Sequence, residues 1–269
     1  MPAAEDLSGG GADLALMIEA ARAAGEIAVA RRVAGFETWE KGGGQGPVTE
    51  VDLEIDRMLR EELTAARPDY GWLSEETEDD VARLEAHRVW IVDPIDGTRA
   101  YAAGEDAFGV SVALAEAGEV IAAAVMLPAR GELFEASRGG GARKDGAAIS
   151  ASARTDEDGA AALASKFGLK ADRWPGGPPP VTRHFRASLA WRLCLVGEGR
   201  FDASLSVGGV WEWDAAPALI AEEAGAAVRD AEGARPVFNR REPRLHGLIA
   251  SAPALMPGFL RRLGAEDRG

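Results

Sequence analysis

The stretch "WIVDPIDGTRAY" (residues 90–101) joins an apolar run directly to two closely spaced carboxylates. The apolar residues at 88–92 predict a buried strand, so Asp93 should lie at its C-terminal end. Pro94 has no N–H to donate to a neighbouring strand, and we therefore expect strand pairing to stop there. The stretch thus predicts a negative charge at the edge of the hydrophobic core.

The residues after Asp93 predict a turn that brings the second carboxylate beside the first. Asp96-Gly97 is typical of a turn, in which Gly97 can adopt a positive φ. Thr98 can then begin a helix, whose free backbone N–H groups form an anion site. Two carboxylates that face one point raise each other's pKa unless a cation is present. Because Asp-Pro and Asp-Gly are also ordinary turn dipeptides, a plain strand-turn-helix remains open for this stretch alone.

Other acids also lie beside apolar segments. Glu75 and Glu76 end a second predicted strand, and Asp52 lies in the first turn of a predicted helix. Asp214 is expected at the N-cap of a helix over 213–225. Each acid has an ordinary explanation, since first-turn acids favour the helix dipole and paired glutamates often face solvent. Together with the two acids of the opening stretch, they favour a cation site.

The rest of the sequence predicts a mixed α and β sandwich. Helical periodicity covers 12–33 and about 51–66, whereas 108–137 contains three apolar runs separated by turn residues, which is typical of a strand meander. A composition shift near 150–160 divides the chain. We expect a flexible tail at 1–11, an N-terminal α+β lobe at 12–148 that carries most metal ligands, and a C-terminal α/β lobe at 149–265.

The net charge of −14 limits the partners of this 269-residue chain. An acidic surface repels polyanions, so nucleic-acid polymers and anionic membranes are poor partners. No apolar run approaches the roughly 20 residues of a membrane span, and the first ten residues do not resemble a signal peptide. Cys194 is the only cysteine, which excludes an internal disulfide. We expect a protein of the reducing cytoplasm.

Four blocks of the sequence resemble the signature blocks of the inositol monophosphatase family. They are Lys41 with "TEVD" (49–52), "EET" (75–77), "DPIDGT" (93–98) and "WDAAPALIAEEAG" (213–225), in the family's order and spacing. The family also includes bisphosphate nucleotidases, fructose-bisphosphatase-like enzymes and some histidinol-phosphate phosphatases. The resemblance covers almost the whole chain, and it implies a layered αβαβα sandwich that usually forms a homodimer.

The resemblance implies a magnesium site. The family's metal ligands match the side chains of Glu75, Asp93, Asp96 and Asp214, with the carbonyl oxygen of Ile95 as a further ligand. Oxygen ligands that also meet a phosphate suit two or three Mg²⁺ ions, for which Mn²⁺ can substitute. Zinc is not expected, because His87, His184 and His246 show no ligand spacing.

The resemblance further implies hydrolysis of a small phosphorylated metabolite by a metal-activated water. Asp52 and Thr98 match the pair that orients this water, and Glu75 is a further candidate. In-line attack on phosphorus would need no phosphoenzyme, and positioning and charge neutralisation would supply most of the rate. The backbone N–H groups of Gly97 and Thr98 match the phosphate donors. Lys41 begins the stretch "KGGGQGPVT", which we interpret either as a mobile loop over the site or as an ordinary surface loop.

Other classes fit the sequence less well. Haloacid dehalogenases need a second acid two residues after the first, whereas Asp96 follows Asp93 by three. Cys194 and Arg200 have the spacing of a tyrosine phosphatase loop, but Glu198 lies between them, so we interpret Cys194 as a small buried residue. A metal-responsive regulatory protein with a decayed site is the non-enzyme alternative, which the intact acids in every block argue against.

The choice of substrate depends on residues near the "WD" block. Inositol-selective members commonly carry an acid several residues before it, where Ser206 and Val207 stand here. The stretch "GVWEWDAAPA" is closer to bacterial 3′(2′),5′-bisphosphate nucleotidases, so we favour adenosine 3′,5′-bisphosphate, with inositol 1-phosphate and histidinol phosphate as alternatives. The candidate substrate contacts are Trp211, Trp191 and Phe185 for a base, and Arg183, Arg186 and Ser188 for a second phosphate or for hydroxyls.

Overall fold

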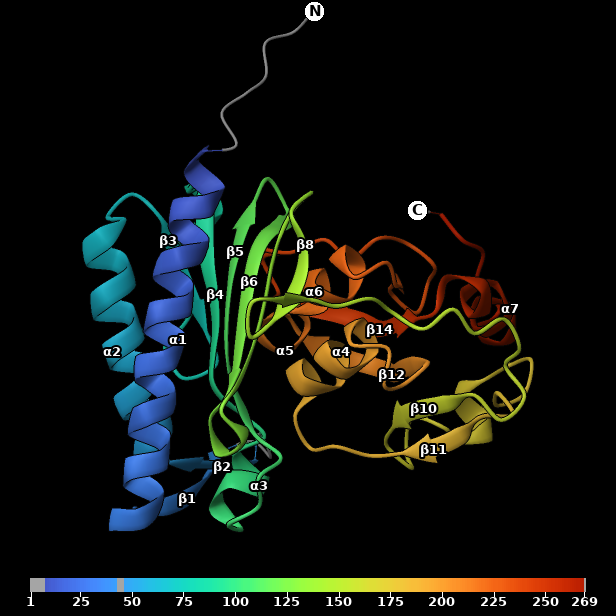
Figure 1. The fold of residues 1–269 in the computed structure, drawn as a ribbon, viewed down its shortest axis with the longest axis horizontal. Coiled ribbons are helices and arrows are strands. Elements are labelled where there is room, and N and C mark those ends of the chain that lie inside the picture. The colour runs from blue at the N-terminus through green and yellow to red at the C-terminus, as the bar shows by residue number, and fades with distance from the viewer. Residues whose placement is uncertain (1–7, 43–45, 269) are drawn as a thin grey trace, which may run out of the picture.

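The computed structural model describes residues 8–42 and 46–268, which fold into alternating layers of helix and sheet (Figure 1). From left to right in Figure 1, two long helices cover a seven-stranded sheet, and short helices separate this sheet from a five-stranded one. A helix near the C-terminus covers the far face of the second sheet. The predicted αβαβα sandwich is confirmed.

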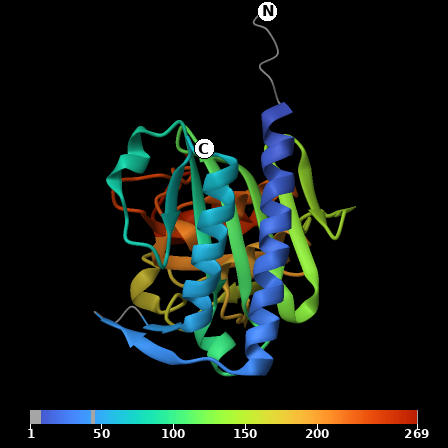
Figure 2. The same cartoon turned by 90° about the vertical axis from the view of Figure 1, so that its left-hand side faces the viewer.

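The first layer consists of helices α1 (Ser8–Ala34) and α2 (Glu50–Ala66), which lie side by side on the seven-stranded sheet (Figure 2). Both helices were expected from their periodicity. Thr49 caps α2 and forms a capping box with Asp52, so the start of this helix also fixes one acid of the site. Because α1 begins at Ser8, residues 8–11 of the expected tail are helical; residues 1–7 lie outside the described residues.

The first sheet contains its strands in sequence order, and this arrangement confirms the predicted meander. Only its first pair of strands is parallel. One face packs on α1 and α2, and the other packs on the middle helices. The strands are β3 (Gly71–Ser74), β4 (Arg88–Asp96), β5 (Gly109–Glu116), β6 (Glu119–Leu127), β7 (Glu132–Ser137), β8 (Gly141–Lys144) and β9 (Ala147–Ala148).

Strand β4 does not stop at Pro94 as the sequence predicted. Asp93 pairs with Ser111 of β5 and Asp96 pairs with Gly109, while the register shifts between these two pairs. The strand therefore passes Pro94 by forming a bulge, which is one of the few places where a sheet accepts proline. The bulge bends the strand at the two acids of the opening stretch.

The second sheet has the order β11-β10-β12-β14-β13. Its outer face packs against α7 (Met256–Leu263), around Phe259 and Leu260. No described residue in the proline-rich stretch 173–181 belongs to a strand. The strands are β10 (Ala161–Ala164), β11 (Thr182–His184), β12 (Ala203–Trp211), β13 (Ala227–Arg229) and β14 (Arg244–Ser251).

The middle layer contains α4 (Leu189–Gly197), α5 (Glu212–Ala215) and α6 (Ala218–Glu223). The prediction of one continuous helix capped by Asp214 was wrong. The cap of α5 is Trp211, and Asp214 lies inside α5. Pro217 separates α5 from α6, because proline removes a helical hydrogen bond and clashes with the preceding turn.

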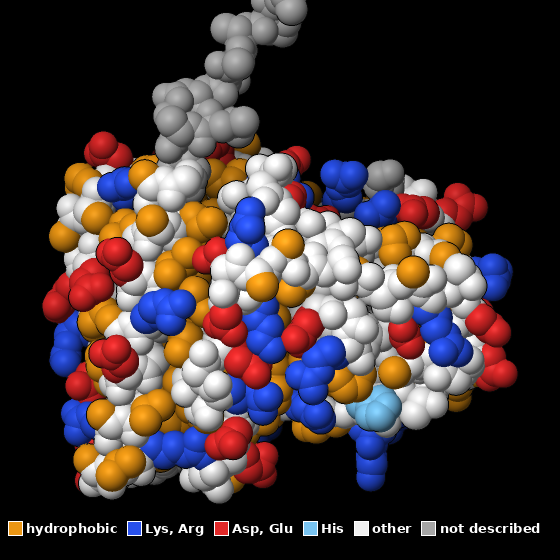
Figure 3. Space-filling model, viewed as in Figure 1, with side chains coloured by type: hydrophobic (Ala, Val, Ile, Leu, Met, Phe, Trp, Pro, Cys, Tyr) orange, Lys and Arg blue, Asp and Glu red, His pale blue; other side chains and the backbone are white. Residues whose placement is uncertain are grey.

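The two sheets share one hydrophobic core, which includes Ile91 of β4 and Leu248 of β14. The segment 149–160 connects the last strand of the first sheet to the first strand of the second. Within residues 8–42 and 46–268, none of the helices is long and apolar enough to span a bilayer. On the face shown in Figure 3, acidic and basic side chains are interspersed with apolar ones, so the negative charge is not gathered into one patch there.

Shorter elements complete the fold. The stretch expected to be a loop at 41–49 instead contributes to a two-stranded ribbon of β1 (Thr38–Lys41) and β2 (Gly46–Thr49), while residues 43–45 lie outside the described residues. The short helices are α3 (Thr98–Ala102), η2 (Val81–Glu85), η3 (Pro128–Arg130), η4 (Ala171–Arg173) and η5 (Pro253–Leu255).

Candidate active site

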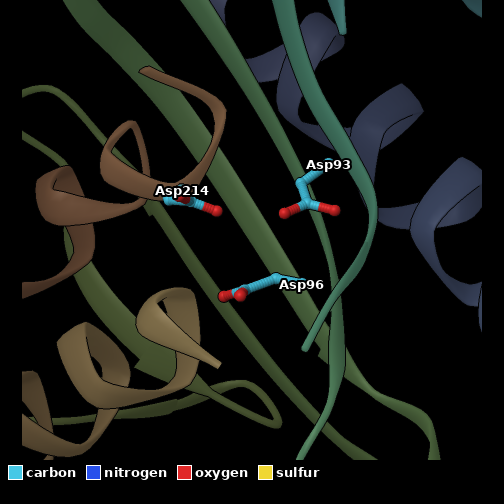
Figure 4. Close-up of side chains that lie close together, drawn as sticks. All are labelled: Asp93, Asp96 and Asp214. Carbon is cyan, nitrogen blue, oxygen red and sulfur yellow. The ribbon is translucent and has the colours of Figure 1, made fainter. Parts of the chain in front are cut away.

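Three carboxylates from two distant parts of the chain meet in the middle of the molecule. Asp93 and Asp96 flank the bulge of β4, and Asp214 reaches them from α5 (Figure 4). One oxygen from each of the three lies within 4.8 Å of the others. The structure therefore brings together the acids that the sequence had placed on separate elements.

The cluster is buried, and its charges are poorly compensated by protein groups. Asp93 is 1 % exposed, and among the described residues neither of its carboxylate oxygens has a hydrogen-bond partner. Burial first, and then the charge of Glu75 and the other acids, raises the pKa of Asp93 well above its usual range. Burial and the charges of Asp96 and Glu75 do the same for the pKa of Asp214. An orphaned carboxylate among other acids suits a bound cation, so these residues fit the implied metal.

Asp96 is held more firmly than Asp93. Its Oδ2 accepts hydrogen bonds from the Ser188 hydroxyl at 2.7 Å and from the Ala190 backbone N–H at 2.5 Å. Burial nevertheless raises the pKa of Asp96 to about 6, against the opposing effect of these bonds. Ser188 is fully buried and also caps α4, so its hydroxyl orients an acid of the cluster.

Thr98 and Asp52 form a second polar group beside the cluster. The Thr98 hydroxyl lies 3.1 Å from Asp52 Oδ1 and 3.1 Å from the carbonyl oxygen of Ile95. Asp52 Oδ2 accepts the backbone N–H of Thr49 at 2.9 Å and its hydroxyl at 2.5 Å. Burial is the main reason that the pKa of Asp52 is raised, although hydrogen bonds from both threonines oppose it.

Gly97 allows the chain to turn sharply between β4 and α3. Its φ is 99°, and an added Cβ would lie 2.7 Å from the carbonyl oxygen of Ala107. Any other residue here would be strained by its own backbone and would clash with a neighbouring one. The expected positive φ is confirmed, and it places Thr98 as the first residue of α3.

Lys41 pairs with both glutamates of the "EET" block. Its Nζ lies 2.9 Å from Glu75 Oε1 and 2.6 Å from Glu76 Oε1. Burial lowers the pKa of Lys41, but the two glutamates outweigh this effect and raise it overall. Burial raises the pKa of Glu76 to about 7 despite the bond from Lys41. Lys41 thus neutralises part of the acidic site from the side of the β1–β2 ribbon.

An open cleft of about 600 Å³ lies over the carboxylate cluster. Lys41, Asp52, Ile95, Arg183 and Ser188 do not line it. Arg183 is exposed on β11 and donates to the carbonyl of Ala164. Of the sequence-predicted site residues, those that line the cleft are Glu75, Asp93, Asp96, Gly97, Thr98 and Asp214, and the aromatic residues beside them are Phe185, Trp211 and Trp213.

Arg192 is a cleft residue that the sequence analysis missed. It lies on α4, is 9 % exposed, and donates to the carbonyls of Arg186 and Ala187 at 2.6 and 3.1 Å. Its guanidinium lowers the pKa of Asp96 and of Asp214, although burial is the larger effect for both. A single arginine in the apolar stretch "LAWRLCLV" was the available signal, because arginine is rarely buried without a partner.

Cys194 and the histidines do not take part in the site. Cys194 is fully buried on α4, and burial raises the pKa of its thiol well above the usual value, so it is not a ready thiolate. His87, just before β4, is exposed, as are His184 of β11 and His246 of β14. The interpretation of Cys194 as a core residue is confirmed.

The fold and the carboxylate cluster together define a layered αβαβα protein with a candidate metal centre at an open cleft. The family model described as "Inositol monophosphatase family" matches residues 13–266. The chain belongs to this family and is accordingly a phosphatase, a phosphoric monoester hydrolase of a metal-dependent family.

Relatives and solved structures agree with this assignment. The chain is 38% identical to an "Inositol-1-monophosphatase" of Rhizobium meliloti over 202 residues, covering 69% of this chain and 73% of the relative. It is 33% identical to a "3′-phosphoadenosine 5′-phosphate phosphatase" of Mycobacterium leprae over 270 residues, covering 92% of each chain. The structure of the Thermotoga maritima IMPase has a TM-score of 0.78 at 27% identity, covering 92% of this chain and 94% of the other.

Proposed function

We propose that this chain hydrolyses the phosphate ester of a small metabolite with Mg²⁺ bound by Asp93, Asp96 and Asp214. Glu75 and the carbonyl oxygen of Ile95 would complete the ligand set. The observation that carries the proposal is the buried, unpartnered carboxylate of Asp93 within a cluster of three acids. When bound, divalent ions would neutralise the phosphate, acidify water and stabilise the leaving oxygen.

The residues of the chain itself would position the reacting water. The Thr98 hydroxyl can donate to Asp52 Oδ1 and accept a proton from a water in the cleft, which places that water beside the cluster. Asp52 then accepts the proton through Thr98, and its raised pKa makes it a better base than an ordinary aspartate. The N–H groups of Gly97 and Thr98 would hold phosphate oxygens at the start of α3.

Further expectations about the enzyme go with this proposal. We propose two or three Mg²⁺ ions per site, with Mn²⁺ as a substitute, because every side-chain ligand is a carboxylate. We also propose a homodimer that acts in the cytoplasm. Lys41 is proposed to control the charge of Glu75, to which it is ion-paired, rather than to contact the substrate directly.

We propose a nucleoside bisphosphate, adenosine 3′,5′-bisphosphate, as the substrate. Beside the acids, the cleft is lined by the indole rings of Trp211 and Trp213, which stack with centroids 4.9 Å apart and planes 9° apart. Phe185, which is 47% exposed, adds a third aromatic face on which a base can stack. Trp191 is only 6% exposed and does not line this cleft, so it is dropped as a base contact.

The nearest acid to the "WD" block is not available to bind sugar hydroxyls. Glu212 is fully buried, and its two oxygens accept the backbone N–H groups of Asn239 and Arg240 at 2.7 and 3.0 Å. Ser206 and Val207 occupy the earlier positions where inositol-selective members commonly carry an acid. This arrangement argues against inositol 1-phosphate, which stays the second candidate because of the relative in Rhizobium meliloti.

A phosphate-release panel tests the proposal. The protein, with Mg²⁺, would be given adenosine 3′,5′-bisphosphate, inositol 1-phosphate, histidinol phosphate and fructose 1,6-bisphosphate. We expect the highest kcat/KM for the nucleotide and no release in the presence of a chelator. A clear preference for inositol 1-phosphate would overturn the substrate, and metal binding without release from any ester would favour the regulatory alternative.

A further inference from the structure

A second pocket of about 580 Å³ opens from the cleft on the side of β12. It shares Asp96, Asp214 and Arg192 with the cleft, so the two form one continuous space around the carboxylate cluster. Its remaining charged residues are Arg173, from the short helix η4, and Arg244, from the start of β14. Three guanidinium groups therefore face two carboxylates in a protein whose net charge is −14.

Arg173 is fixed in this pocket by one hydrogen bond and one ring contact. Its Nη1 donates to the carbonyl oxygen of Val207 at 3.0 Å, and its guanidinium lies 3.6 Å from the ring centroid of Phe167. Its Nε is buried and has no hydrogen-bond partner among the described residues. Nη1 is the guanidinium nitrogen that forms a hydrogen bond within the described residues, so the remaining N–H groups outside the buried Nε are left for a bound anion.

The bulge of β12 makes room for both arginines. The register of β12 against β14 shifts between Val207 and Val210, at two glycines. An added Cβ at Gly208 would lie 2.8 Å from Arg173 Nη1, and one at Gly209 would lie 2.2 Å from Arg244 Nε. Glycine at both positions thus allows the two guanidinium groups to lie directly against the strand.

Arg173 and Arg244 are not neutralised by described residues of the protein, whereas the charge of Arg192 is partly balanced by Asp96 and Asp214. Within the described part of the chain, Arg173, Arg192 and Arg244 form no ion pair. Arg244 is exposed and lies over the ring of Trp211 at 5.2 Å from its centroid. Trp211 also lines the cleft, so Arg244 lies between the aromatic residues of the cleft and the other arginines of the second pocket.

We infer that this pocket binds a second phosphate group of the substrate, held by Arg173 and Arg244. The inference rests on the proposed function, because it places the reacting phosphate at the carboxylate cluster and the base on the aromatic residues. Guanidinium groups match phosphate oxygens in geometry and charge, and they bind phosphate without being deprotonated. The pocket would make the enzyme prefer bisphosphorylated over monophosphorylated substrates.

The test compares two substrates that share the reacting phosphate. Adenosine 3′,5′-bisphosphate and adenosine 3′-monophosphate would be assayed with the wild type, with Arg244→Gln and with Arg173→Gln. Loss of one charge-assisted bond corresponds to about tenfold or more in binding, so we expect each variant to reduce the bisphosphate-to-monophosphate ratio of kcat/KM by about that factor. The matched control is Arg241→Gln, which removes an exposed positive charge outside the pocket and should keep the ratio.

A second variant and a binding measurement guard against misfolding and against failure of the proposed reaction. Gly209→Ala should displace the Arg244 side chain without removing its charge, and it should also reduce the ratio. Calorimetric titration in a chelating buffer, in which the carboxylate cluster repels a phosphate, should show that adenosine 5′-monophosphate binds more tightly than adenosine, and that Arg244→Gln removes this difference. An unchanged ratio in both arginine variants, or equal binding of these two ligands by the wild type, would overturn the inference. Failure to hydrolyse any phosphate ester would instead overturn the proposed function.

Discussion

The Thr98 hydroxyl lies 3.1 Å from Oδ1 of Asp52, although the two residues are 46 positions apart in the sequence. Asp52 keeps this orientation because its other oxygen accepts two hydrogen bonds from Thr49, the N-cap of α2. A helix cap therefore fixes the direction of an acid that faces the start of a different helix. The same interaction couples the local structure of α2 to the chemistry proposed for Thr98.

Thr98→Val should reduce kcat by about 10²-fold or more, because it removes the hydroxyl through which Asp52 would receive a proton. The side chain keeps its shape, so the protein should stay folded, with a melting temperature lowered by a few degrees because the buried Asp52 loses a hydrogen bond. Phosphate release under saturating Mg²⁺ measures the effect, and Thr64→Val is the matched control, since Thr64 is a partly buried residue of α2 away from the cleft. A Thr98→Val enzyme with more than half of wild-type kcat would contradict the proposed role.

Asp93→Asn should abolish both turnover and stabilisation by Mg²⁺. A ligand at 100 times its Kd adds about 2.7 kcal/mol to the free energy of unfolding. The melting temperature of the wild type should therefore rise by several degrees when Mg²⁺ is added. The variant loses a charged ligand that no hydrogen bond holds for a structural purpose, so it should stay folded and show no rise. Melting temperatures of both proteins, measured with Mg²⁺ and with a chelator, test this prediction. An equal rise with Mg²⁺ in the wild type and the variant would show that Asp93 is not a ligand of the ion.

The metal-free protein should become less stable as the pH rises from about 5.5 to 7.5. Burial raises the pKa of Glu76 and of Glu212 to about 7, from the usual 4.5. In this range the folded protein binds protons that the unfolded chain has already released, so the free energy of unfolding falls with increasing pH, by about 1–3 kcal/mol. Urea unfolding in a chelating buffer, repeated at several pH values, measures how the free energy of unfolding changes with pH.

Glu212→Gln provides the control for this dependence on pH, because among the described residues Glu212 accepts hydrogen bonds from backbone N–H groups alone. The variant loses an acceptor and should be less stable overall. Its free energy of unfolding should fall less steeply with pH, because one fewer titrating carboxyl contributes to the slope. A wild-type stability that stays constant or rises over this interval would show that these carboxylates titrate normally in the folded protein.

Asp56→Asn should weaken metal binding without removing a ligand. Asp56 lies on α2 and accepts the hydroxyls of Ser74 and Thr77, the two residues that flank Glu75 and Glu76. Changes to residues that orient metal ligands typically cost 10- to 100-fold in metal affinity, so the Mg²⁺ concentration for half-maximal activity should rise by about this factor. Glu61→Gln, an exposed change on the same helix, should leave that concentration unaltered.

Much of the fold could be predicted because local signals agree with the tertiary structure. The meander at 108–137 alternates apolar runs with turn residues, and Thr49 has the pattern of a helix cap. The errors arose where tertiary contacts decide. Pro94 looked like the end of a strand, but pairing of Asp96 with Gly109 continues the strand beyond a bulge. The helix expected over 213–225 is interrupted at Pro217, next to the acid that has to reach the cluster.

The acids of the site could be recognised from the sequence, whereas most of their surroundings could not. Ser188 resembled a substrate contact, but the start of α4 points its hydroxyl at Asp96. Arg173 and Arg244 are far apart in the sequence and carry no motif, and only the bulge of β12 places them in one pocket. A spacing pattern records which residues are near in the chain, and pockets depend on elements that meet only after folding.

The acids of the candidate cation site come from two distant parts of the chain: two flank the bulge of β4, and the third comes from α5, beyond the 149–160 connection. During translation, a nascent chain that has completed the meander still lacks Asp214, so it cannot form the three-acid cluster proposed to bind the ion. Phosphatase activity should therefore appear late in synthesis, after α5 has left the ribosome and docked. A proteolytic fragment that ends before residue 200 should be inert even if its own sheet persists.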